Sequence, residues 1–324
     1  LSITFSLQRS MRDKQIWRVL KDTYQEWNED KASRLAAALA YYTIFSVAPL
    51  LIIVIAIAGA VFGEEAVRGE IVHQIQSLVG KDGAEFIQTA IRNTNRQGAG
   101  TNIIASLIGI GVLIFGASGV FAQLQDALNT IWEVAPKPNA GLKGMVRTRF
   151  LSFAMILVIA FLLLVSLVVS AGLAGMSNFA SQLLPGADAL WQLLNFAVSF
   201  GVVTLLFALI FRVLPDAQIA WGDVWIGAII TALLFNIGKF FLGLYLGNSS
   251  FGSTYGAAGS LVIIVAWIYY AAQILFFGAE FTQVYARKYG SRIVPADYAM
   301  SVTEEVRAQQ GIPHRETLER RDRS

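Results

Sequence analysis

The stretch "TALLFNIGKFFLGLYLG" (residues 231–247) is apolar almost throughout and carries a single charge, Lys239. Its length approaches the roughly 20 residues that an α-helix needs to cross a bilayer. A lysine at the centre of such a helix costs roughly 2.5–3.5 kcal/mol on insertion scales. The stretch therefore predicts a membrane span, and Lys239 is the first residue whose presence needs an explanation.

Charged residues are scarce in the rest of the chain as well. Of its 324 residues 55% are hydrophobic and 15% are charged, whereas a soluble domain has about 25% charged residues. No Asp, Glu, Lys or Arg occurs in residues 35–63, 97–125, 150–187 or 189–211, and Lys239 is the only one in 224–279. Each of these stretches is long enough for one or two spans.

These stretches predict an all-α, polytopic membrane protein. We expect six transmembrane helices, at about residues 35–61, 102–122, 150–176, 191–213, 221–246 and 257–280. The segment "GNSSFGSTYGAAGS" (247–260) separates the last two, either as a linker or as non-helical backbone that enters the outer leaflet. Pro49 is expected to kink the first helix. Gly116 and Gly119 predict close packing of the second.

The basic residues predict the orientation of these helices. Twenty of the 25 Lys and Arg residues fall near the two termini or in loops on the same side as the termini, and only Arg68, Lys81, Arg92 and Arg96 lie in the opposite loops. Because cytoplasmic loops carry the excess of Lys and Arg, both termini are expected in the cytoplasm. This asymmetry also accounts for the net charge of +3 without a nucleic-acid partner.

The chain divides into a cytoplasmic amphipathic arm (1–34), a membrane domain (35–286) and a polar cytoplasmic tail (287–324) whose residues beyond about 296 are expected to be loosely ordered. A helix over residues 11–27 would place Ile16, Val19, Leu20, Tyr24 and Trp27 on one face. This face suits the membrane surface and equally suits packing beneath the helical bundle.

The first outer loop (62–101) also has helical periodicity. Its apolar residues recur at helical spacing in two groups, which are Ile71, Ile75, Leu78 and Val79, and then Phe86, Ile87, Ala90 and Ile91. We expect two short amphipathic helices that cover the outer face of the bundle.

Four strings resemble one known family. They are "AAALAYYTIFSVAPLL" (36–51), "GVFAQLQDALNTIWEV" (119–134), "RVLPDAQIAWGDVWIGAIITALLF" (212–235) and "YGAAGSLVIIVAWIYYAAQILFFGAEFTQVYA" (255–286). The chain resembles the YihY/BrkB family of bacterial inner-membrane proteins over most of residues 30–290. The resemblance implies six helices, both termini inside and location in the inner membrane. It implies no settled activity, although members have carried the labels ribonuclease BN and virulence factor.

A ribonuclease or other hydrolase is not supported by the residues. Metal-assisted phosphodiester cleavage needs a cluster of His, Asp, Glu or Cys ligands. The two histidines, His73 and His314, are expected on opposite sides of the membrane, and the chain has no cysteine, GxSxG elbow or Walker P-loop. We therefore expect no enzyme, no resident metal and no cofactor.

Polar residues within the spans are the remaining candidates for function. Lys239 lies in the outer half of its helix, at a depth similar to those of Asn236 and Asn195. We interpret these three as candidates for binding an anionic headgroup in an outer cavity. The alternative is that Lys239 only extends its side chain to the outer headgroups.

A second polar layer is expected near the cytoplasmic ends of the helices. Its candidate members are Glu280, Arg212, Arg149, Asp126 and Gln123. An ion pair of Glu280 with Arg212 or Arg149 would either fix helix packing or act as a cytoplasmic gate. Pairing of Glu280 with Lys239 is excluded by depth, because about 20 Å would separate them along the membrane normal.

Two functions follow from these candidates. The first is a transporter or flippase of a lipid or other anionic amphiphile, with the outer amphipathic helices as a lid. The second is a non-transporting membrane scaffold for envelope-associated proteins, in which the basic arm carries the binding. Membrane lipids, anionic ones included, are the expected partners, and a homo-oligomer or an envelope protein remains open as a further partner.

Overall fold

The computed structural model describes most of the membrane helices and the segments that join them at one end. The described residues are 17–65, 67–69, 71–73, 75–76, 84–85, 87–89, 103–138, 150, 154, 158, 162, 188–247, 251–314 and 317. The elements are α2 (Ala32–Phe62), α4 (Ile103–Ile131), β1 (Val134–Pro136), α6 (Asp188–Val213), β2 (Ala217–Gln218), α7 (Trp221–Gly247), α8 (Phe251–Lys288), β3 (Val294–Pro295), β4 (Ala299–Ser301) and α9 (Glu304–Gln309). Residues 17–29 form a helix at the start of the described chain, here called the arm helix.

Four of these helices are long and apolar enough to cross a membrane. The qualifying segments are Ala32–Ala56, Gln192–Val213, Trp221–Phe241 and Leu261–Lys288. In addition, α4 contains the span predicted at 102–122. Of the helix predicted at 150–176 the described residues are Phe150, Ala154, Val158 and Leu162, all helical. A multi-pass membrane protein is therefore supported, while the total of six spans stays a prediction.

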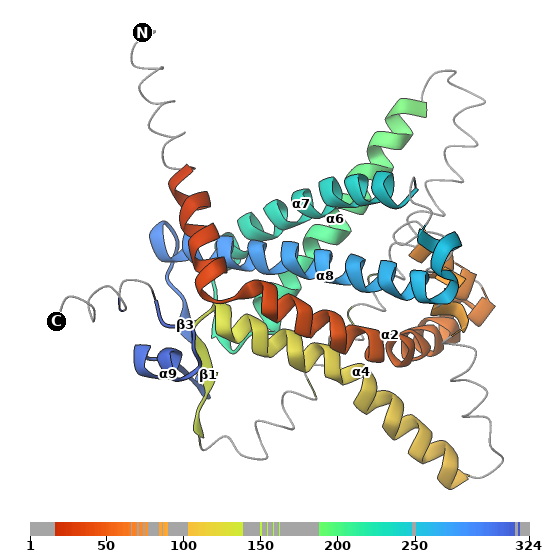
Figure 1. Ribbon diagram of the computed structural model, residues 1–324, viewed down its shortest axis with the longest axis horizontal. Helices are drawn as coiled ribbons and strands as arrows, with labels where there is room; N and C mark the ends of the chain where they lie inside the picture. Colours follow the sequence, from red (N-terminus) through yellow and green to blue (C-terminus); the bar gives the residue numbers. More distant parts are fainter. Residues whose placement is uncertain are drawn as a thin grey trace.

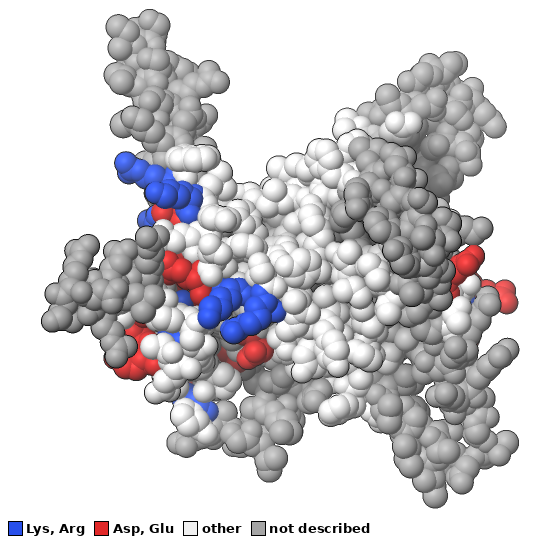
Figure 2. All heavy atoms as spheres, viewed as in Figure 1, with Lys and Arg blue, Asp and Glu red and all other residues white. Residues whose placement is uncertain are grey.

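The helices pack around α2 and α8. The first, α2, packs against α4 and α8, and α7 packs against α6 and α8. In Figure 1, α2, α4, α7 and α8 run along the long axis of the molecule and α6 crosses them obliquely. Figure 2 shows charged side chains gathered at the ends of this axis, with an uncharged belt between them. Such a belt is what helices need in order to face hydrocarbon.

Glycines let the helices approach closely at two contacts. A methyl group on Gly116 of α4 would lie 3.3 Å from Pro49 Cγ of α2, so the predicted close packing of the second helix occurs here. Between α7 and α8 the contact is reciprocal. The Thr282 side chain fills the space beside Gly227, and Thr231 fills the space beside Gly278. Each threonine hydroxyl donates to the glycine carbonyl four residues earlier in its own helix, at 2.7 Å.

The glycine-rich segment 247–260 is helical over residues 251–260, which form the first ten residues of α8. The alternative of non-helical backbone is therefore wrong for these ten residues. A helix satisfies its own backbone hydrogen bonds, which matters more in hydrocarbon than the conformational cost of its glycines. At its other end α8 continues to Lys288, eight residues beyond the predicted end at 280.

The segments that follow α4, α6 and α8 form a small mixed structure, here called the cap (residues 132–138, 214–220 and 289–314). Strand β1 pairs antiparallel with β4, so that Ala135 faces Met300, and β2 pairs with β3, so that Gln218 faces Val294. Ile312 and Arg307 are buried. The prediction of a loosely ordered tail beyond residue 296 is thus wrong for residues 297–314, which contain β4 and α9. Short strands leave no periodic signal in the sequence and depend on partners far away in it.

Both ends of the described chain meet at the cap (Figure 1). Val19 of the arm helix is buried against Phe281 and Val284 of α8, whereas Trp17 and Tyr24 are exposed. Packing on the bundle therefore accounts for one side of this helix. At the opposite end of the molecule, Ile71 and Ile87 of the predicted outer loop join the main core. Leu78, Val79, Phe86, Ala90 and Ile91 lie outside the described residues, so the two outer helices stay a prediction.

Candidate functional site

Lys239 lies far from the cap. Sixteen residues of α7 separate it from Asp223, or about 24 Å along the helix, and Asp223 accepts hydrogen bonds from the Ser291 backbone N–H (3.0 Å) and hydroxyl (2.9 Å) in the cap. The Lys239 side chain is half-buried, and no described residue is its hydrogen-bond or ion-pair partner. Among the described residues its ammonium group thus has no partner.

The two asparagines predicted beside Lys239 do not bond to it. Asn236 donates its amide to the Ala232 carbonyl in its own helix, at 2.8 Å. Asn195 lies on α6 and is exposed. A shared binding role for the three residues therefore stays a prediction.

An apolar groove lies between the arm helix, α7 and α8. Its volume is about 360 Å³, within the range of small-molecule sites. Its walls are Tyr24, Trp27, Leu234, Ile237, Tyr270, Gln273, Ile274 and Phe277. The Tyr270 side chain lies directly against Gly238, whereas Lys239, the next residue of α7, is not among the residues that line the groove. The arm helix contributes Tyr24 and Trp27 to the lining.

Glu280 lies one turn beyond Phe277 on α8 and is completely buried. Neither of its carboxylate oxygens has a hydrogen-bond partner among the described residues. The charged groups that act on it are Asp30, Glu26, Arg307 and Glu133. Arg212, one of its predicted partners, instead donates to the Ile219 carbonyl and lies over the Trp221 ring, 5.8 Å from its centroid. Arg149, the other, lies outside the described residues.

The arginine nearest to this group comes from the tail. Arg307 of α9 donates from Nη2 to Asp30 Oδ1 at 2.6 Å, and the two side chains are 2% and 3% exposed. Burial raises the pKa of Asp30 to about 7, although the charge of Arg307 lowers it. The pair joins the end of the arm helix to α9 across 277 positions of sequence.

His314 lies among carboxylates. Its Nδ1 faces Glu304, and its Nε2 lies 3.2 Å from Glu133 Oε1 and 3.7 Å from Glu26 Oε2. The hydrogen bond to Glu133 raises the pKa of His314 to about 9, and Glu304 adds to the effect while burial opposes it. The protonated imidazolium therefore acts as an internal cation that bridges the arm helix to the cap.

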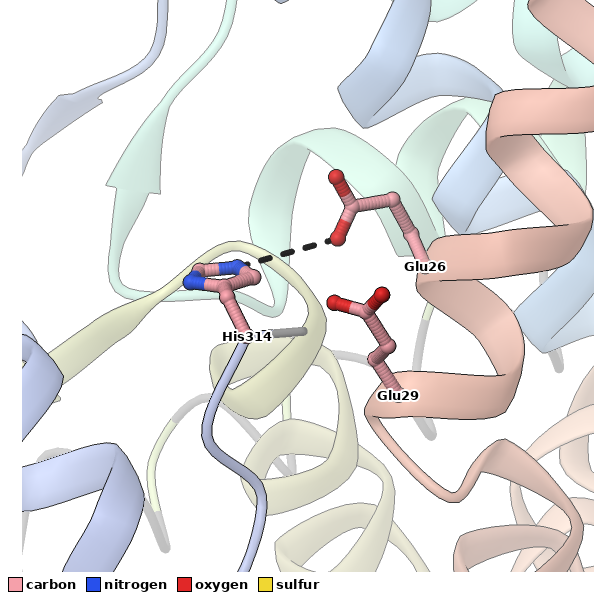
Figure 3. Close-up of side chains that lie close together, drawn as sticks. All are labelled: Glu26, Glu29 and His314. Atoms are coloured by element: carbon pink, nitrogen blue, oxygen red, sulfur yellow. Dashed lines mark ion pairs between the residues drawn. The ribbon is translucent and has the colours of Figure 1, made fainter. Parts of the chain in front are cut away.

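Figure 3 shows Glu26 and Glu29 of the arm helix pointing toward this imidazole. Ligand atoms of Glu26, Glu29 and His314 lie within 4.8 Å of one another, a spacing that would also suit a metal ion. Ligation needs an unprotonated imidazole nitrogen, whereas both nitrogens here face carboxylates that favour the imidazolium. The chemistry of these residues thus fits a bound proton better than a bound metal.

Backbone conformation helps to direct these side chains. Among the described residues, Lys31, Glu133 and Arg292 are the non-glycine residues with positive φ, at 53°, 54° and 60°. Each such conformation costs on the order of 1–3 kcal/mol and persists only where its surroundings hold it. Glu133 is held by His314 and by Arg287 and Arg307, whose guanidinium nitrogens lie 3.5 and 3.9 Å from its carboxylate.

A second buried polar contact ties α4 to the cap. Gln125 and Asn129 donate their amides to the two oxygens of Asp216, at 3.0 and 2.9 Å. The Asp216 backbone N–H donates in return to Asn129 Oδ1 at 2.8 Å. Two residues of α4 predicted for the polar layer near the cytoplasmic ends of the helices, Asp126 and Gln123, are exposed and half-buried, respectively. The residues of α4 that make the contact are therefore Gln125 and Asn129 and not the predicted Gln123 and Asp126.

Sequence reasoning missed most of the residues that surround Glu280. Asp30 is followed by Lys31 and Arg34 before the uncharged stretch 35–63 begins, and Asp126 lies between the stretch 97–125 and Glu133, so neither acid stands out in the sequence. Arg307 and His314 do not stand out either, because the tail around them is polar throughout.

Comparison with known proteins identifies the family. A family model described as "Virulence factor BrkB" matches residues 23–301. Three relatives are named UPF0761 membrane protein. The one from Alteromonas mediterranea is 29% identical over 78% of this chain and 83% of its own length. The one from Teredinibacter turnerae is 28% identical over 84% of this chain and 61% of its own length. The one from Kangiella koreensis is 25% identical over 80% of this chain and 61% of its own length.

The names of these relatives state that they are membrane proteins and give no catalytic function. No solved structure matches this chain. The four quoted strings and the family model agree over most of the sequence. The chain therefore belongs to the virulence factor BrkB family of membrane proteins.

Proposed function

We propose that the protein is a transporter or flippase of a lipid or other anionic amphiphile in the bacterial inner membrane. The observation that carries the proposal is the apolar groove, which is lined by Trp27 of the arm helix and by Tyr270, whose side chain lies against Gly238 of α7. An acyl chain matches its Leu, Ile and aromatic walls. A headgroup phosphate or carboxylate matches the ammonium of Lys239.

Lys239 has a physical reason to bind such a headgroup. An isolated ammonium at membrane depth is costly, and an anion from the ligand offsets part of that cost. The groove adjoins exposed apolar side chains of α7, among them Leu233 and Phe240, which are 51% and 63% exposed. A lipid would therefore enter sideways from the bilayer without leaving an apolar environment. In contrast to the cavity expected from sequence, this groove also extends toward the cap.

The proposal places the cap on the cytoplasmic side. Most Lys and Arg residues belong to the arm, the cap and the loops beside it, which is the distribution of cytoplasmic segments. The arm helix would then form a wall of the groove at the inner leaflet, and Lys239 would lie in the outer half.

Headgroup translocation in proteoliposomes tests the proposal. Fluorescent phospholipids are incorporated, and the fraction that reaches the other leaflet is followed with a membrane-impermeant quencher. The wild type should accelerate translocation. Ile237→Trp, which fills the groove, should reduce the rate at least tenfold. Ile229→Trp is the matched control, because Ile229 has nearly the same exposure, 47% against 46%, on the same helix but does not line the groove.

Variants of Lys239 test the role of its charge separately from the role of the groove. Lys239→Ala should slow anionic phospholipids more than zwitterionic ones, and Lys239→Arg should retain most of the rate. If the folded wild type moves no lipid, the alternative of a membrane scaffold that binds partners through its basic arm replaces the transporter.

A further inference from the structure

Glu280 differs from every other buried carboxylate described above. Asp216, Asp223 and Asp30 each accept hydrogen bonds from named partners. Glu280 is 0% exposed, belongs to a membrane-spanning segment, and has two oxygens without a partner among the described residues. A carboxylate ion in such a place would bear a large desolvation cost, so the group is expected as the neutral acid.

The surrounding charges also favour the neutral form of Glu280. The charged groups that act on Glu280 are Glu26 from the arm helix, Asp30 directly after this helix, Glu133 after α4, and Arg307 from α9. Three of these four are acids, and the one cation among them already binds Asp30 at 2.6 Å. A further negative charge here would therefore repel these carboxylates and compete for the guanidinium group.

This site adjoins the groove on both of its walls. On α8, Phe277 lines the groove and Glu280 follows three residues later. On the arm helix, Trp27 lines the groove, and Asp30 follows in the turn that ends this helix, where its backbone N–H donates to the Glu26 carbonyl. Residues three apart are neighbours on a helix, so any movement of the arm helix affects the groove and the acid together.

We propose that Glu280 is a reversible proton-binding site that couples occupation of the groove to closure of the cap. In the closed state Glu280 holds a proton and Arg307 binds Asp30, which fastens α9 to the arm helix. Loss of the proton to water at the cap leaves a carboxylate that draws Arg307 away from Asp30. Arg307 Nε, buried and without a described partner, is a free donor for this exchange. The arm helix and its Trp27 are then released from α9.

The proposal rests on the proposed function only for the identity of the ligand in the groove. Because coupling is reciprocal, a ligand that moves the arm helix must also change the proton affinity of Glu280. An amphiphile in the groove would thus take up or release a proton, which makes the proton the coupling ion of transport.

Infrared spectroscopy of the full chain tests the site directly. In dodecyl maltoside at neutral pH, the wild type should show the carbonyl band of a buried protonated carboxylic acid. Because the pKa of Asp30 is about 7, that group is also partly protonated at neutral pH. Glu280→Gln, which has the shape of the neutral acid, should remove the part of the band that persists in Asp30→Asn, whereas Glu305→Gln, at an exposed position, should retain the whole band. Asp30→Asn shows which residue carries the proton. A band that disappears in Asp30→Asn and persists in Glu280→Gln would overturn the assignment of the proton to Glu280.

The coupling has its own readout. Adding phosphatidylglycerol to the micelles should shift the midpoint of the band's pH titration by at least half a pH unit in the wild type, and less in Ile237→Trp. A band with an unchanged midpoint would overturn the coupling. If the shift occurs while proteoliposomes move no lipid, the transporter proposal fails and the proton site stands.

Discussion

At the scale of single residues, the cluster around Glu280 depends on side chains that only the folded chain brings together. Glu280 itself could be selected from sequence, because it is an acid at the end of an apolar stretch. Its neighbours could not, since Asp30 and Arg307 are 277 positions apart and each resembles an ordinary charged residue of a polar segment. The same holds for His314, whose importance comes from the carboxylates around it.

His314 should make the stability of the cap depend on pH. Its pKa is about 9 in the folded protein against 6.5 for a free histidine. Its stabilising contribution is therefore complete below pH 6.5 and is lost as the pH rises through 9. We expect a loss of about 1–3 kcal/mol across this range, seen as a lower melting temperature in detergent.

His314→Gln should remove most of this pH dependence and make the cap less stable at pH 6.5. The control is His73→Gln, which changes the only other histidine and leaves the cluster intact. An equal pH dependence in His314→Gln and the wild type would show that the imidazolium does not hold the cap.

Removing one member of the Asp30–Arg307 pair should destabilise the protein strongly, whereas replacing both by apolar residues should change its stability little. Removing one partner of a buried pair leaves the other charge uncompensated, at a cost of about 3–5 kcal/mol. Arg307→Met should therefore destabilise the protein by about that amount. The double variant Asp30→Leu/Arg307→Met should recover most of the loss. A double variant no more stable than Arg307→Met would contradict this account, and thermal unfolding in detergent decides it.

At the scale of elements, the helices were largely predictable and their contacts were not. Long uncharged stretches predicted the described helices within a few residues, except that α4 ends nine residues later than expected and α8 is longer at both ends. The glycines of the α7–α8 contact escaped prediction because glycine is frequent throughout the chain. Nothing in the sequence marks Gly227 and Gly278 as the two that face threonines of the neighbouring helix.

Substitutions on α7 test this contact. In Gly227→Ala the added methyl would overlap the Thr282 side chain, so α7 and α8 must separate. We expect a destabilisation of about 1–3 kcal/mol and a lower yield of folded protein. Gly222→Ala is the control on the same helix, because nothing lies within 4 Å of its added methyl. It should be neutral or stabilising by up to about 1 kcal/mol.

At the scale of the whole molecule, composition was enough to predict a helical membrane protein, and the orientation drawn from the distribution of basic residues stays a prediction. The cap was not predictable. Its strands have two or three residues, too few for a periodic pattern, and they pair segments from three distant parts of the chain.

The orientation can be checked in cells, because the chain has no native cysteine to interfere with labelling. Glu305→Cys in the cap and Glu65→Cys at the opposite end both introduce an exposed thiol. A membrane-impermeant maleimide added to intact spheroplasts should label Glu65→Cys and reach Glu305→Cys only after lysis. The reverse pattern would place the cap outside and contradict the proposed path from the inner leaflet.

The joining of the two termini has a consequence for how the protein is made. The arm helix leaves the ribosome before the membrane helices, but Arg307, the partner of Asp30, is synthesised 277 residues after Asp30, roughly 14–55 s later at about 5–20 residues per second. During that time Asp30 and the polar face around it have no guanidinium to bind. The start of the chain therefore reaches its final form only after every membrane helix has been inserted, and a chain interrupted before Arg307 would present an unfinished first helix to the proteases and chaperones of the cell.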